Sequence, residues 1–293
     1  MPGPTILLLQ LLISGLLLGG FYALLASGLN IVYGIVGILN IAHGDIAMLG
    51  SYLAFFSFTL VGISPLFAAL GAVLIFAVLG YIAYTGLFSR IVSKSKTLNV
   101  ESSTLLIAFA LIIIIEGAAS LAFSAQQVSY QYLSQGIDIG GIVLVPTALI
   151  GFITGAIVSI VLYLVFYHTW LGRSFRCVMD DPTAAQLVGI STKRVYLLVT
   201  TIGFALTGLA GVMTSLLYAI SPFIGLDYTI IAFVVVVIGG AGSIKGNWYG
   251  GLILGLAQTL GVELTSPALG AAISYILLIV VLILRPAGLF GRR

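Results

Sequence analysis

Residues Pro65–Val100 read PLFAALGAVLIFAVLGYIAYTGLFSRIVSKSKTLNV, a long apolar run followed at once by a short basic segment. The apolar run, Pro65–Phe88, exceeds the roughly 20 residues that a helix needs to cross the hydrocarbon core of a bilayer. The segment after it carries Arg90, Lys94 and Lys96 and no acidic residue. Because lysine and arginine accumulate in the cytoplasmic loops of membrane proteins, this stretch predicts a transmembrane helix that ends in the cytoplasm.

The same alternation of apolar runs and polar gaps extends over the rest of the chain. The apolar runs are Ile6–Leu29, Ile41–Val61, Pro65–Phe88, Ser103–Phe123, Val145–Tyr167, Val195–Tyr218, Thr229–Ile244, Trp248–Leu264 and Ala268–Leu284. The segments 89–100, 168–194 and 286–293 hold most of the basic residues and are predicted to be cytoplasmic, which leaves 124–144 and 221–228 outside. We therefore expect an all-α polytopic integral membrane protein, built as a single transmembrane domain over residues 1–293.

Glycine and polar residues leave the number of crossings open at two places, Ile31–Gly50 and Ile230–Gly255. Eight or nine transmembrane helices fit the pattern, with glycine-broken segments at these two places. Nine crossings put the N-terminus outside, whereas eight crossings, with Ile41–Val61 re-entrant, put it inside. Interrupted helices of this kind occur where the backbone lines a cavity. The first run is expected to be a retained span, because it is too long and too rich in glycine for a cleaved signal.

The composition excludes a soluble globular protein. Of the 293 residues, 61% are hydrophobic and 6% are charged, and the mean hydropathy is +1.26, whereas a soluble domain carries about 25% charged residues. The net charge of +3 reflects the cytoplasmic segments and requires no nucleic-acid partner. The lone Cys177 allows neither an internal disulfide nor a cysteine-based metal site. Any ATPase or receptor domain is expected on another chain, because no segment here is long and polar enough.

A polar, glycine-punctuated stretch, Gly28–Asp45, lies inside sequence of membrane depth. Asn30, Asn40, His43 and Asp45 are costly in hydrocarbon unless they find a partner or water, so they mark a candidate pathway. The alternative is structural: His43 and Asp45 bond each other or nearby backbone and fix a break in the helix. For His43 we favour this alternative. One histidine and one aspartate are too few ligands for a metal site.

Glu116 is a second candidate, deep in the run Ser103–Phe123 with no charged residue within one helical turn. An intramembrane carboxyl group is a functional hypothesis by default. A hydrogen bond between helices explains it equally well. Asp227 and Glu263 lie near the predicted outer ends of their runs, where a solvated side chain is expected.

The longest basic segment contains signals for a short helix. Asp181 suits the capping position, Pro182 suits the first helical position, and Gly189 suits the end. Ala184, Ala185, Leu187 and Val188 give this helix an apolar side. A short amphipathic helix can lie on the membrane surface or dock into a groove of a partner protein, and its periodicity does not distinguish the two.

Glycines recur at intervals of four residues, which places them on one face of a helix. These sets are Gly15/Gly19, Gly151/Gly155, Gly242/Gly246/Gly250 and Gly251/Gly255. Without side chains on that face, a neighbouring helix can approach closely, so tight packing is the main expectation. A sliding surface for a conformational cycle is the alternative.

Motifs for bond-making chemistry are missing from the sequence. It has no Gly-Lys dipeptide and hence no phosphate-binding P-loop, no Gly-x-Ser-x-Gly elbow, no His-Glu-x-x-His and no cofactor fingerprint. We therefore expect neither an enzyme nor a cofactor bound to this chain.

Taken together, the polar stretch, the basic segment and the glycine-rich C-terminal part resemble the permease subunits of branched-chain amino acid ABC importers of the LivH type. The first block matches at Gly28-Leu29, Tyr33-Gly34, Gly37, Asn40, Ala42-His43-Gly44, Met48, Gly50 and Tyr52. The second matches at Gly172-Arg173, Arg176, Asp181, Ala185, Leu187 and Gly189-Ile190. The third matches at Gly208–Gly211, Pro222, Gly225, Gly239-Gly240, Gly242-Ser243, Gly246, Gly250-Gly251 and Gly255, and the tail at Arg285-Pro286, Gly288-Leu289 and Gly291. The likeness covers nearly the whole chain, with one departure at Ile244–Trp248, where relatives more often carry small residues or proline.

The resemblance implies a permease subunit of an ATP-driven importer for branched-chain or other hydrophobic amino acids, in the inner membrane of a bacterium or archaeon. It implies two ATPase subunits that hold the ATP, a second permease (LivM-like or a copy of this chain) and an extracellular solute-binding protein. Similar permeases serve urea and short amides, and more distant ones serve sugars. A stand-alone secondary transporter, with Asp45 and Glu116 binding protons or ions, is the alternative from another class.

The resemblance also assigns roles to individual residues. It makes Arg173–Ile190, within the cytoplasmic segment 168–194, a coupling helix that docks on an ATPase. The residues expected to shape that helix are Arg173, Arg176, Asp181, Ala185, Leu187 and Gly189. We expect Asn40, His43, Asp45 and Glu116 along or beside the translocation pathway, and Gly242, Gly246, Gly250 and Gly255 in helix packing.

Overall fold

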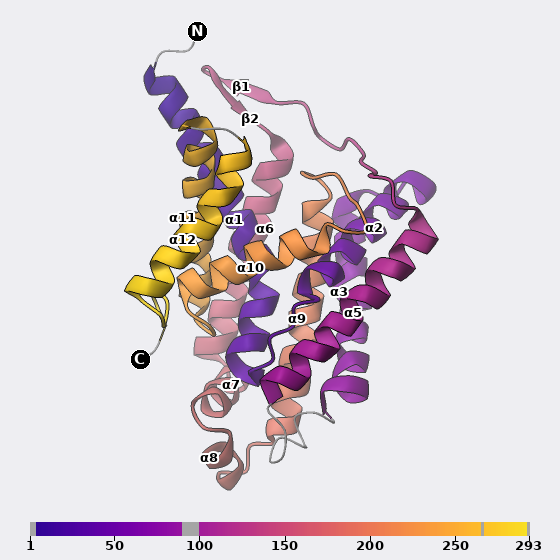
Figure 1. The fold of residues 1–293 in the computed structure, drawn as a ribbon, viewed down its shortest axis with the longest axis vertical. Coiled ribbons are helices and arrows are strands. Elements are labelled where there is room, and N and C mark those ends of the chain that lie inside the picture. Colours follow the sequence, from indigo (N-terminus) through magenta and orange to yellow (C-terminus); the bar gives the residue numbers. More distant parts are fainter. Residues whose placement is uncertain (1–3, 90–99, 265–266, 292–293) are drawn as a thin grey trace.

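The computed structural model describes residues 4–89, 100–264 and 267–291, most of which are helical (Figure 1). The helices are α1 (Pro4–Val36), α2 (His43–Val61), α3 (Pro65–Ala83) with its π-helical end η1 (Tyr84–Phe88), α5 (Val100–Phe123), α6 (Pro146–His168), α7 (Trp170–Asp180), α8 (Pro182–Leu187), α9 (Thr192–Thr214), α10 (Gly225–Gly239), α11 (Ile244–Leu264) and α12 (Pro267–Leu284). A hairpin of β1 (Ile137–Ile139) and β2 (Ile142–Leu144) joins α5 to α6.

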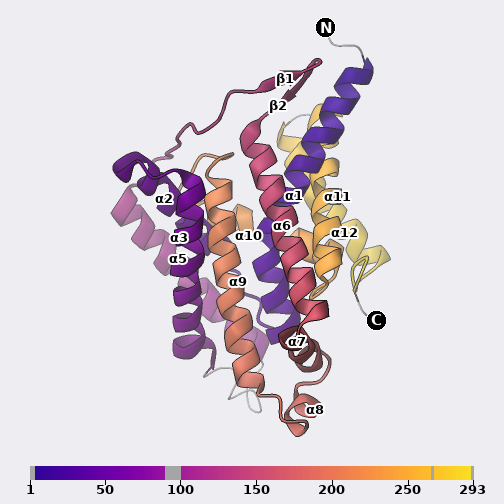
Figure 2. The ribbon, with the colours of Figure 1, turned by 180° about the vertical axis from the view of Figure 1, so that it is seen from behind.

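Helix α1 forms the axis of the bundle. It packs against α6, α9, α10 and α11, and its residues from Phe21 to Val36 contribute a large share of the buried core. The N-terminal end of α1 and the hairpin lie at one end of the molecule, and α7 and α8 lie at the opposite end (Figures 1 and 2). If α7 and α8 face the cytoplasm, as the basic residues of α7 and of the start of α9 indicate, the start of α1 faces outside.

Two breaks interrupt the bundle close to the places where the sequence leaves the crossings open. The chain leaves α1 at Gly37, which has a positive φ of 72°, and enters α2 at His43. The second break, residues 240–243, separates α10 from α11, which are bent by 118° relative to each other. Gly240 and Gly242 both have positive φ in this turn, a backbone conformation that glycine adopts without steric cost.

The chain is a polytopic membrane protein, but the predicted eight or nine transmembrane helices are not confirmed. Six described helices are long and apolar enough to cross a membrane, and seven if the bent pair α10 and α11 forms one span. The difference between the expected and the observed number of spans arises in the C-terminal third of the chain. There the 15-residue α10 is too short to cross alone, and α12 contributes a described apolar stretch of only Ala272–Leu284.

The helix boundaries correct the expected runs in two respects. Helix α1 continues to Val36, past the expected end at Leu29, because the glycines at positions 28 and 34 let other elements approach instead of ending the helix. The segment 168–194 is not a loop around one short helix, since α7 precedes α8 there. Helix α7 is strongly amphipathic and buries Phe175 and Val178, so it contains no long apolar run. Arg90, Lys94, Lys96, Arg292 and Arg293 lie outside the described residues.

The end of the molecule opposite α7 and α8 is covered by the segment between α5 and α6. Val128 forms a β-bridge with Ile220, and the Tyr130 hydroxyl lies 2.8 Å from the Ser215 hydroxyl. Burial raises the pKa of Tyr130 above its usual range, so this hydroxyl stays neutral. Gln10 of α1 bonds the backbone of Val143 through both its amide nitrogen and its amide oxygen. These contacts fasten the hairpin and the preceding segment to α1 and α9.

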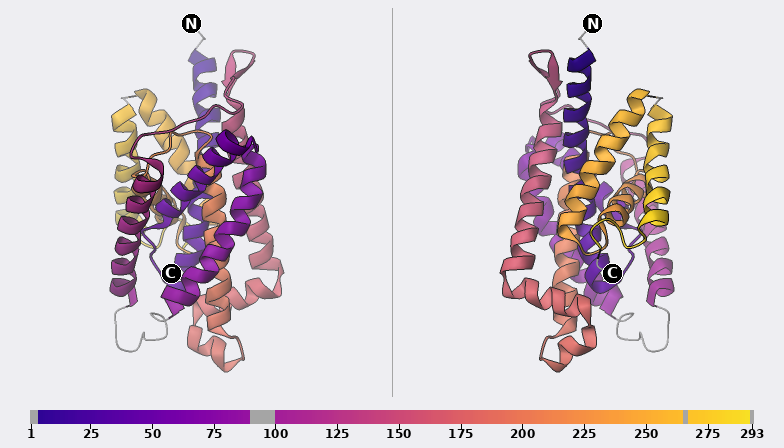
Figure 3. Two further views of the ribbon diagram at one scale, coloured as in Figure 1. Left: turned by 90° about the vertical axis from the view of Figure 1, so that its right-hand side faces the viewer. Right: turned by 90° about the vertical axis from the view of Figure 1, so that its left-hand side faces the viewer.

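Helix α5 stands at the edge of the bundle, with α2 as its main neighbour (Figure 3). Large apolar side chains on its outward face are well exposed, including Leu106, Ile113 and Leu121. In a membrane protein such a face is covered by lipid or by another subunit.

Candidate functional site

The start of α2 is held at the centre of the bundle by His43 and Gly44. The Nε2 atom of His43 lies 2.9 Å from the carbonyl oxygen of Leu25, and its Nδ1 atom lies 3.2 Å from the hydroxyl of Thr207. The backbone N–H of Gly44 donates to the hydroxyl of Thr229 over 2.8 Å, and that hydroxyl donates to Ile41. His43 therefore bonds α1 and α9 and does not bond Asp45.

Asp45 is a buried carboxyl group that its described surroundings leave without a hydrogen-bond partner. Its exposed fraction is 0%, and neither carboxyl oxygen has a hydrogen-bond partner among the residues that the structure describes. One carboxyl oxygen lies against Gly225, the first residue of α10, where any larger side chain would collide with it. Burying a carboxyl group without a partner costs several kcal/mol, so such a group usually marks a functional or switching position.

Two further polar groups lie near Asp45. Glu116 on α5 is half-buried and close enough for its charge to act on the Asp45 carboxyl group. Asn40, in the break between α1 and α2, is buried, and its amide oxygen also has no hydrogen-bond partner in the described part of the chain. The structure thus places Glu116 within electrostatic range of Asp45 and leaves oxygens of Asn40 and Asp45 without a partner among the described residues. His43, in contrast, has both ring nitrogens occupied.

The turn between α10 and α11 is anchored by Asn30 of α1. The backbone N–H of Gly242 donates to the Asn30 side-chain oxygen over 2.9 Å, and the Asn30 amide donates to the carbonyl of Ser243 over 3.1 Å. Gly34 and Gly242 pack backbone to backbone. After α12, the tail returns to the end of α10, where the N–H groups of Leu289 and Phe290 donate to Ile238 and Gly239.

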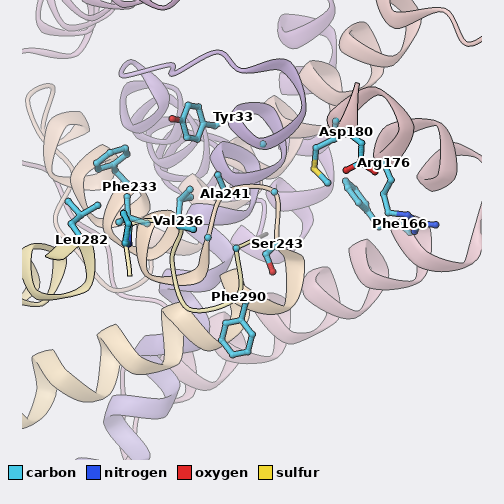
Figure 4. Close-up of a pocket in the computed structure, with 18 of the residues that line it drawn as sticks. Tyr33, Phe166, Arg176, Asp180, Phe233, Val236, Ala241, Ser243, Leu282 and Phe290 are labelled. Atoms are coloured by element: carbon cyan, nitrogen blue, oxygen red, sulfur yellow. The ribbon is translucent and has the colours of Figure 1, made fainter. Parts of the chain in front are cut away.

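A cavity of about 550 Å³ lies beside this turn (Figure 4). It is bounded by the end of α1 at Tyr33, the α7 residues Arg176 and Asp180, the turn 240–243 and the tail at Phe290. Sequence reasoning missed this cavity, because its walls come from five segments of the chain, residues 33–34, 166–167, 176–180, 233–243 and 282–291.

Helices α7 and α8 form the projecting end of the molecule. Asp181 caps α8 as predicted, since one carboxyl oxygen accepts from the N–H groups of Thr183 at 2.7 Å and Ala184 at 3.1 Å. Gly189, with φ of 85°, follows the helix. Ala185 is buried, whereas Leu187 and Val188 are 86% and 74% exposed. This short helix therefore presents apolar side chains away from the bundle.

The two arginines of α7 are engaged within the chain. The guanidinium of Arg176 donates to the carbonyl of Phe166 near the end of α6 and also lies over the ring of Tyr167. Arg173 stacks on Trp170, with 4.1 Å between the guanidinium carbon and the ring centroid. Both contacts fix α7 to itself and to α6.

The glycines at 242, 246, 250 and 255 all lie against backbone or close side chains. Added side chains would meet Met179 and Gly34 at Gly242, Gly239 at Gly246, Val235 and Gly239 at Gly250, and Gly15 and Gly19 at Gly255. Gly246 and Gly250 bring α10 and α11 together around their bend, and Gly255 joins α11 to α1. Gly242 does not share the predicted helix face, because it lies in the turn before α11, where it packs against α7 and α1.

Comparisons with known proteins agree on one family. Residues 11–282 match the family described as "Branched-chain amino acid transport system / permease component". The chain is 33% identical to the high-affinity branched-chain amino acid transport system permease protein LivH of Salmonella typhimurium, over 97% of this chain and 96% of that one. It is 32% identical to the corresponding protein BraD of Pseudomonas aeruginosa, with the same coverage, and 30% identical to a probable LivH of Methanocaldococcus jannaschii, over 92% and 88%.

A solved structure also shares the fold. A chain of the PsaBC complex of Streptococcus pneumoniae, determined with a Fab, superposes with a TM-score of 0.53 over 94% of this chain and 92% of that one. The sequence identity is 13%, so the likeness concerns the arrangement of the helices alone.

Proposed function

The chain belongs to the branched-chain amino acid transport system permease family, and from this premise we propose that it is the permease subunit of an ATP-driven importer for branched-chain amino acids. The family is one of transport permeases, a role without bond-making chemistry. The energy then comes from two ATPase subunits on other chains. A second permease, LivM-like or a copy of this chain, and an extracellular solute-binding protein complete the assembly in the inner membrane of a bacterium or archaeon.

The observation that carries the coupling part of the proposal is the surface of α8. The short helix α8 ends in two large exposed apolar side chains, Leu187 as its last residue and Val188 at its C-cap, and these gain little from facing water. The Asp181 cap and the positive φ at Gly189 hold this surface in one conformation. A preformed apolar projection suits insertion into a groove of a partner protein. We assign that partner as an ATPase subunit.

In this assignment, the other residues of the segment support α8. Arg173 and Arg176 fix α7, from which α8 projects, and the buried Ala185 seats α8 against the rest of the protein. Movement of an ATPase is then transmitted to α6 and α9, which lead into and out of α7 and α8. Reversing a population ratio from 1:99 to 99:1 requires about 5.5 kcal/mol of differential binding, which sets the scale of the coupling.

We also propose that Asn40, His43, Asp45 and Glu116 lie along or beside the translocation pathway. The unpaired oxygens of Asn40 and Asp45 support this, because groups of this kind are costly in a closed membrane protein. The carboxyl groups of Asp45 and Glu116 offer oxygen atoms to an amino group that passes. The part of His43 is to hold the start of α2 in position. Gly242, Gly246, Gly250 and Gly255 keep the bent pair and α1 in close contact.

Reconstitution in vesicles tests the transport function. With the two ATPases, the second permease and the binding protein present, uptake of radiolabelled leucine should require ATP and stop when the ATPases are left out. A glutamate-to-glutamine change in the ATPase active site serves as the control for ATP hydrolysis. Uptake driven by an ion gradient through this chain alone would instead establish a secondary transporter.

A further inference from the structure

A groove of about 340 Å³ runs between α6 and α11 on the outside of the bundle. Its α6 wall is formed by Ala156, Ser159, Ile160 and Tyr163, which share one helical face, and its α11 wall includes Lys245 and Trp248, which share another. Neighbouring apolar residues of α6, such as Ile157 and Val161, are more than half exposed. In a membrane protein, this face of α6 meets the hydrocarbon of the bilayer.

Lys245 places a positive charge at the mouth of this apolar groove. It is exposed, and its ammonium lies 5.1 Å from the ring centroid of Tyr163. Within the described part of the chain, no carboxylate lies within ion-pair distance of it. Lys245 is also in the first turn of α11, where the helix dipole adds partial positive charge. A lysine in this position is complementary to an anion.

The groove contains polar atoms that the chain itself leaves unused. Ser159 lines the groove, is 8% exposed, and its hydroxyl oxygen has no hydrogen-bond partner in the described chain. On the opposite side of the first turn of α11, the Asn247 amide donates to Ala23 and Ser27 of α1. This anchor holds Lys245 and Trp248 facing outward, next to α6.

The position of the groove along the bundle fits the level of lipid headgroups. Lys245 follows the turn 240–243, and Gly242 in that turn lies against Met179 of α7. Tyr163 lies five residues before the end of α6 at His168. Lys245 therefore lies in the half of the molecule that ends in α7 and α8. Tyrosine and tryptophan side chains favour the membrane interface, and Tyr163, Trp248 and Tyr249 surround the lysine.

We infer that the groove between α6 and α11 binds an anionic phospholipid, with Lys245 on the headgroup phosphate and an acyl chain along the apolar wall. This inference needs only a membrane-spanning chain and does not depend on the transported substrate. A lysine near the membrane surface attracts an anionic lipid by about 1 kcal/mol, so an enrichment of about fivefold over a zwitterionic lipid is expected.

Fluorescence quenching of Trp248 tests the inference. The chain has two tryptophans, and Trp170→Phe leaves Trp248 as the single reporter. The protein is reconstituted in two kinds of vesicle with the same mixture of phosphatidylglycerol and phosphatidylcholine. They differ only in which of the two lipids carries bromine, near the headgroup end of its acyl chain. Brominated phosphatidylglycerol should quench Trp248 more strongly, as expected for about fivefold enrichment beside it.

Lys245→Gln should remove the difference between the two kinds of vesicle, and Lys245→Arg should retain it. Lys193→Gln is the matched control, because it removes an equal charge from the exposed start of α9, outside the groove. High salt should weaken the preference in the Trp170→Phe protein itself, which tests the charge without altering Lys245. Equal quenching by both lipids, or a preference that survives Lys245→Gln, would overturn the inference. An absence of quenching by either lipid would show that protein covers the groove, and would overturn it too.

Discussion

At the scale of single residues, Asn30 and Asp45 show two outcomes for a polar group buried in the bundle. The sequence marks both as costly at membrane depth. Asn30 uses its amide oxygen and nitrogen to hold the turn 240–243, which lies more than 200 positions later in the chain. The carboxyl group of Asp45 has no hydrogen-bond partner within residues 4–89, 100–264 and 267–291. The residue type alone could not separate these outcomes, because each depends on a segment far away in the chain.

Asp45→Asn should lower leucine uptake about tenfold while leaving the complex as stable as the parent or more so. The amide keeps the size of the side chain but removes the ionisable carboxyl group, and a buried carboxyl group without a partner among the described residues does not stabilise the fold. Uptake in vesicles and the thermal unfolding midpoint in detergent measure the two effects. Glu116→Gln serves as the comparison, because Glu116 is only half-buried whereas Asp45 is fully buried. This variant should reduce uptake less than Asp45→Asn does.

A lower unfolding midpoint combined with unchanged uptake would indicate that Asp45 has a packing role. If Asp45→Asn lowers the unfolding midpoint and uptake per folded complex stays at the parental level, Asp45 serves the contact between α2 and α10 rather than transport. The same reading applies to Glu116 if its substitution leaves uptake unchanged over a range of pH.

At the scale of elements, local chemistry was predictable and relations between elements were not. The sequence correctly predicts α8, because its cap, its first-turn proline and its terminal glycine lie within nine residues. Both breaks were predicted from their glycines. The sequence did not predict α7, because only one face of this helix is apolar, the face with Phe175 and Val178. Such a face does not produce a long apolar run in the sequence. The cavity beside the turn 240–243 was missed because no single segment encodes it.

Leu187→Asp should reduce ATP-dependent uptake by at least tenfold without preventing assembly of the membrane part. The substitution puts a charge into an apolar surface that, in our proposal, is covered by an ATPase. Uptake and co-purification of the ATPases measure the effect. Thr183→Asp adds the same charge to the first turn of α8, where the helix dipole tolerates it, and should be milder. Parental uptake by the Leu187 variant would exclude α8 as the coupling element.

Gly255→Leu should destabilise the contact between α1 and α11 by several kcal/mol. A side chain at position 255 would overlap the backbone of Gly15 and Gly19, and neither helix can yield without repacking. Gly117→Leu is the matched control, because position 117 on α5 faces open space. Thermal unfolding in detergent compares the two. Equal midpoints would mean that α1 and α11 separate at little cost, as a sliding surface requires.

At the scale of the whole molecule, the sequence establishes a polytopic helical protein but not the number of its crossings. The 15-residue α10 and the bend of 118° make the count depend on whether the bent pair is one span. The hydropathy of a segment reports how apolar it is and gives no information on the angle between two helices. The structure places α7 and α8 at one end of the molecule and the hairpin at the other (Figure 1).

The two ends of the molecule should be accessible from opposite sides of the membrane. Cys177 is the sole cysteine and is exposed on α7, so a membrane-impermeant maleimide should label it only after the cells are opened. In a Cys177→Ser background, Ser134→Cys, in the exposed segment before the hairpin, should be labelled on intact cells. A mass shift on a gel measures the labelling of each of the two cysteines. Labelling of both sites from the same side would contradict the topology.

The pairing of Asn30 with the turn at Gly242 also has a consequence for biogenesis. The ribosome delivers α1 to the bilayer long before it makes that turn. The side-chain amide of Asn30 therefore lacks its hydrogen-bond partners during most of translation. The N-terminal part of the protein is then not stably held in the membrane until the C-terminal part has been synthesised. A nascent chain cut short before Gly242 should be recognised by membrane quality control and degraded, although most of its apolar helices are complete.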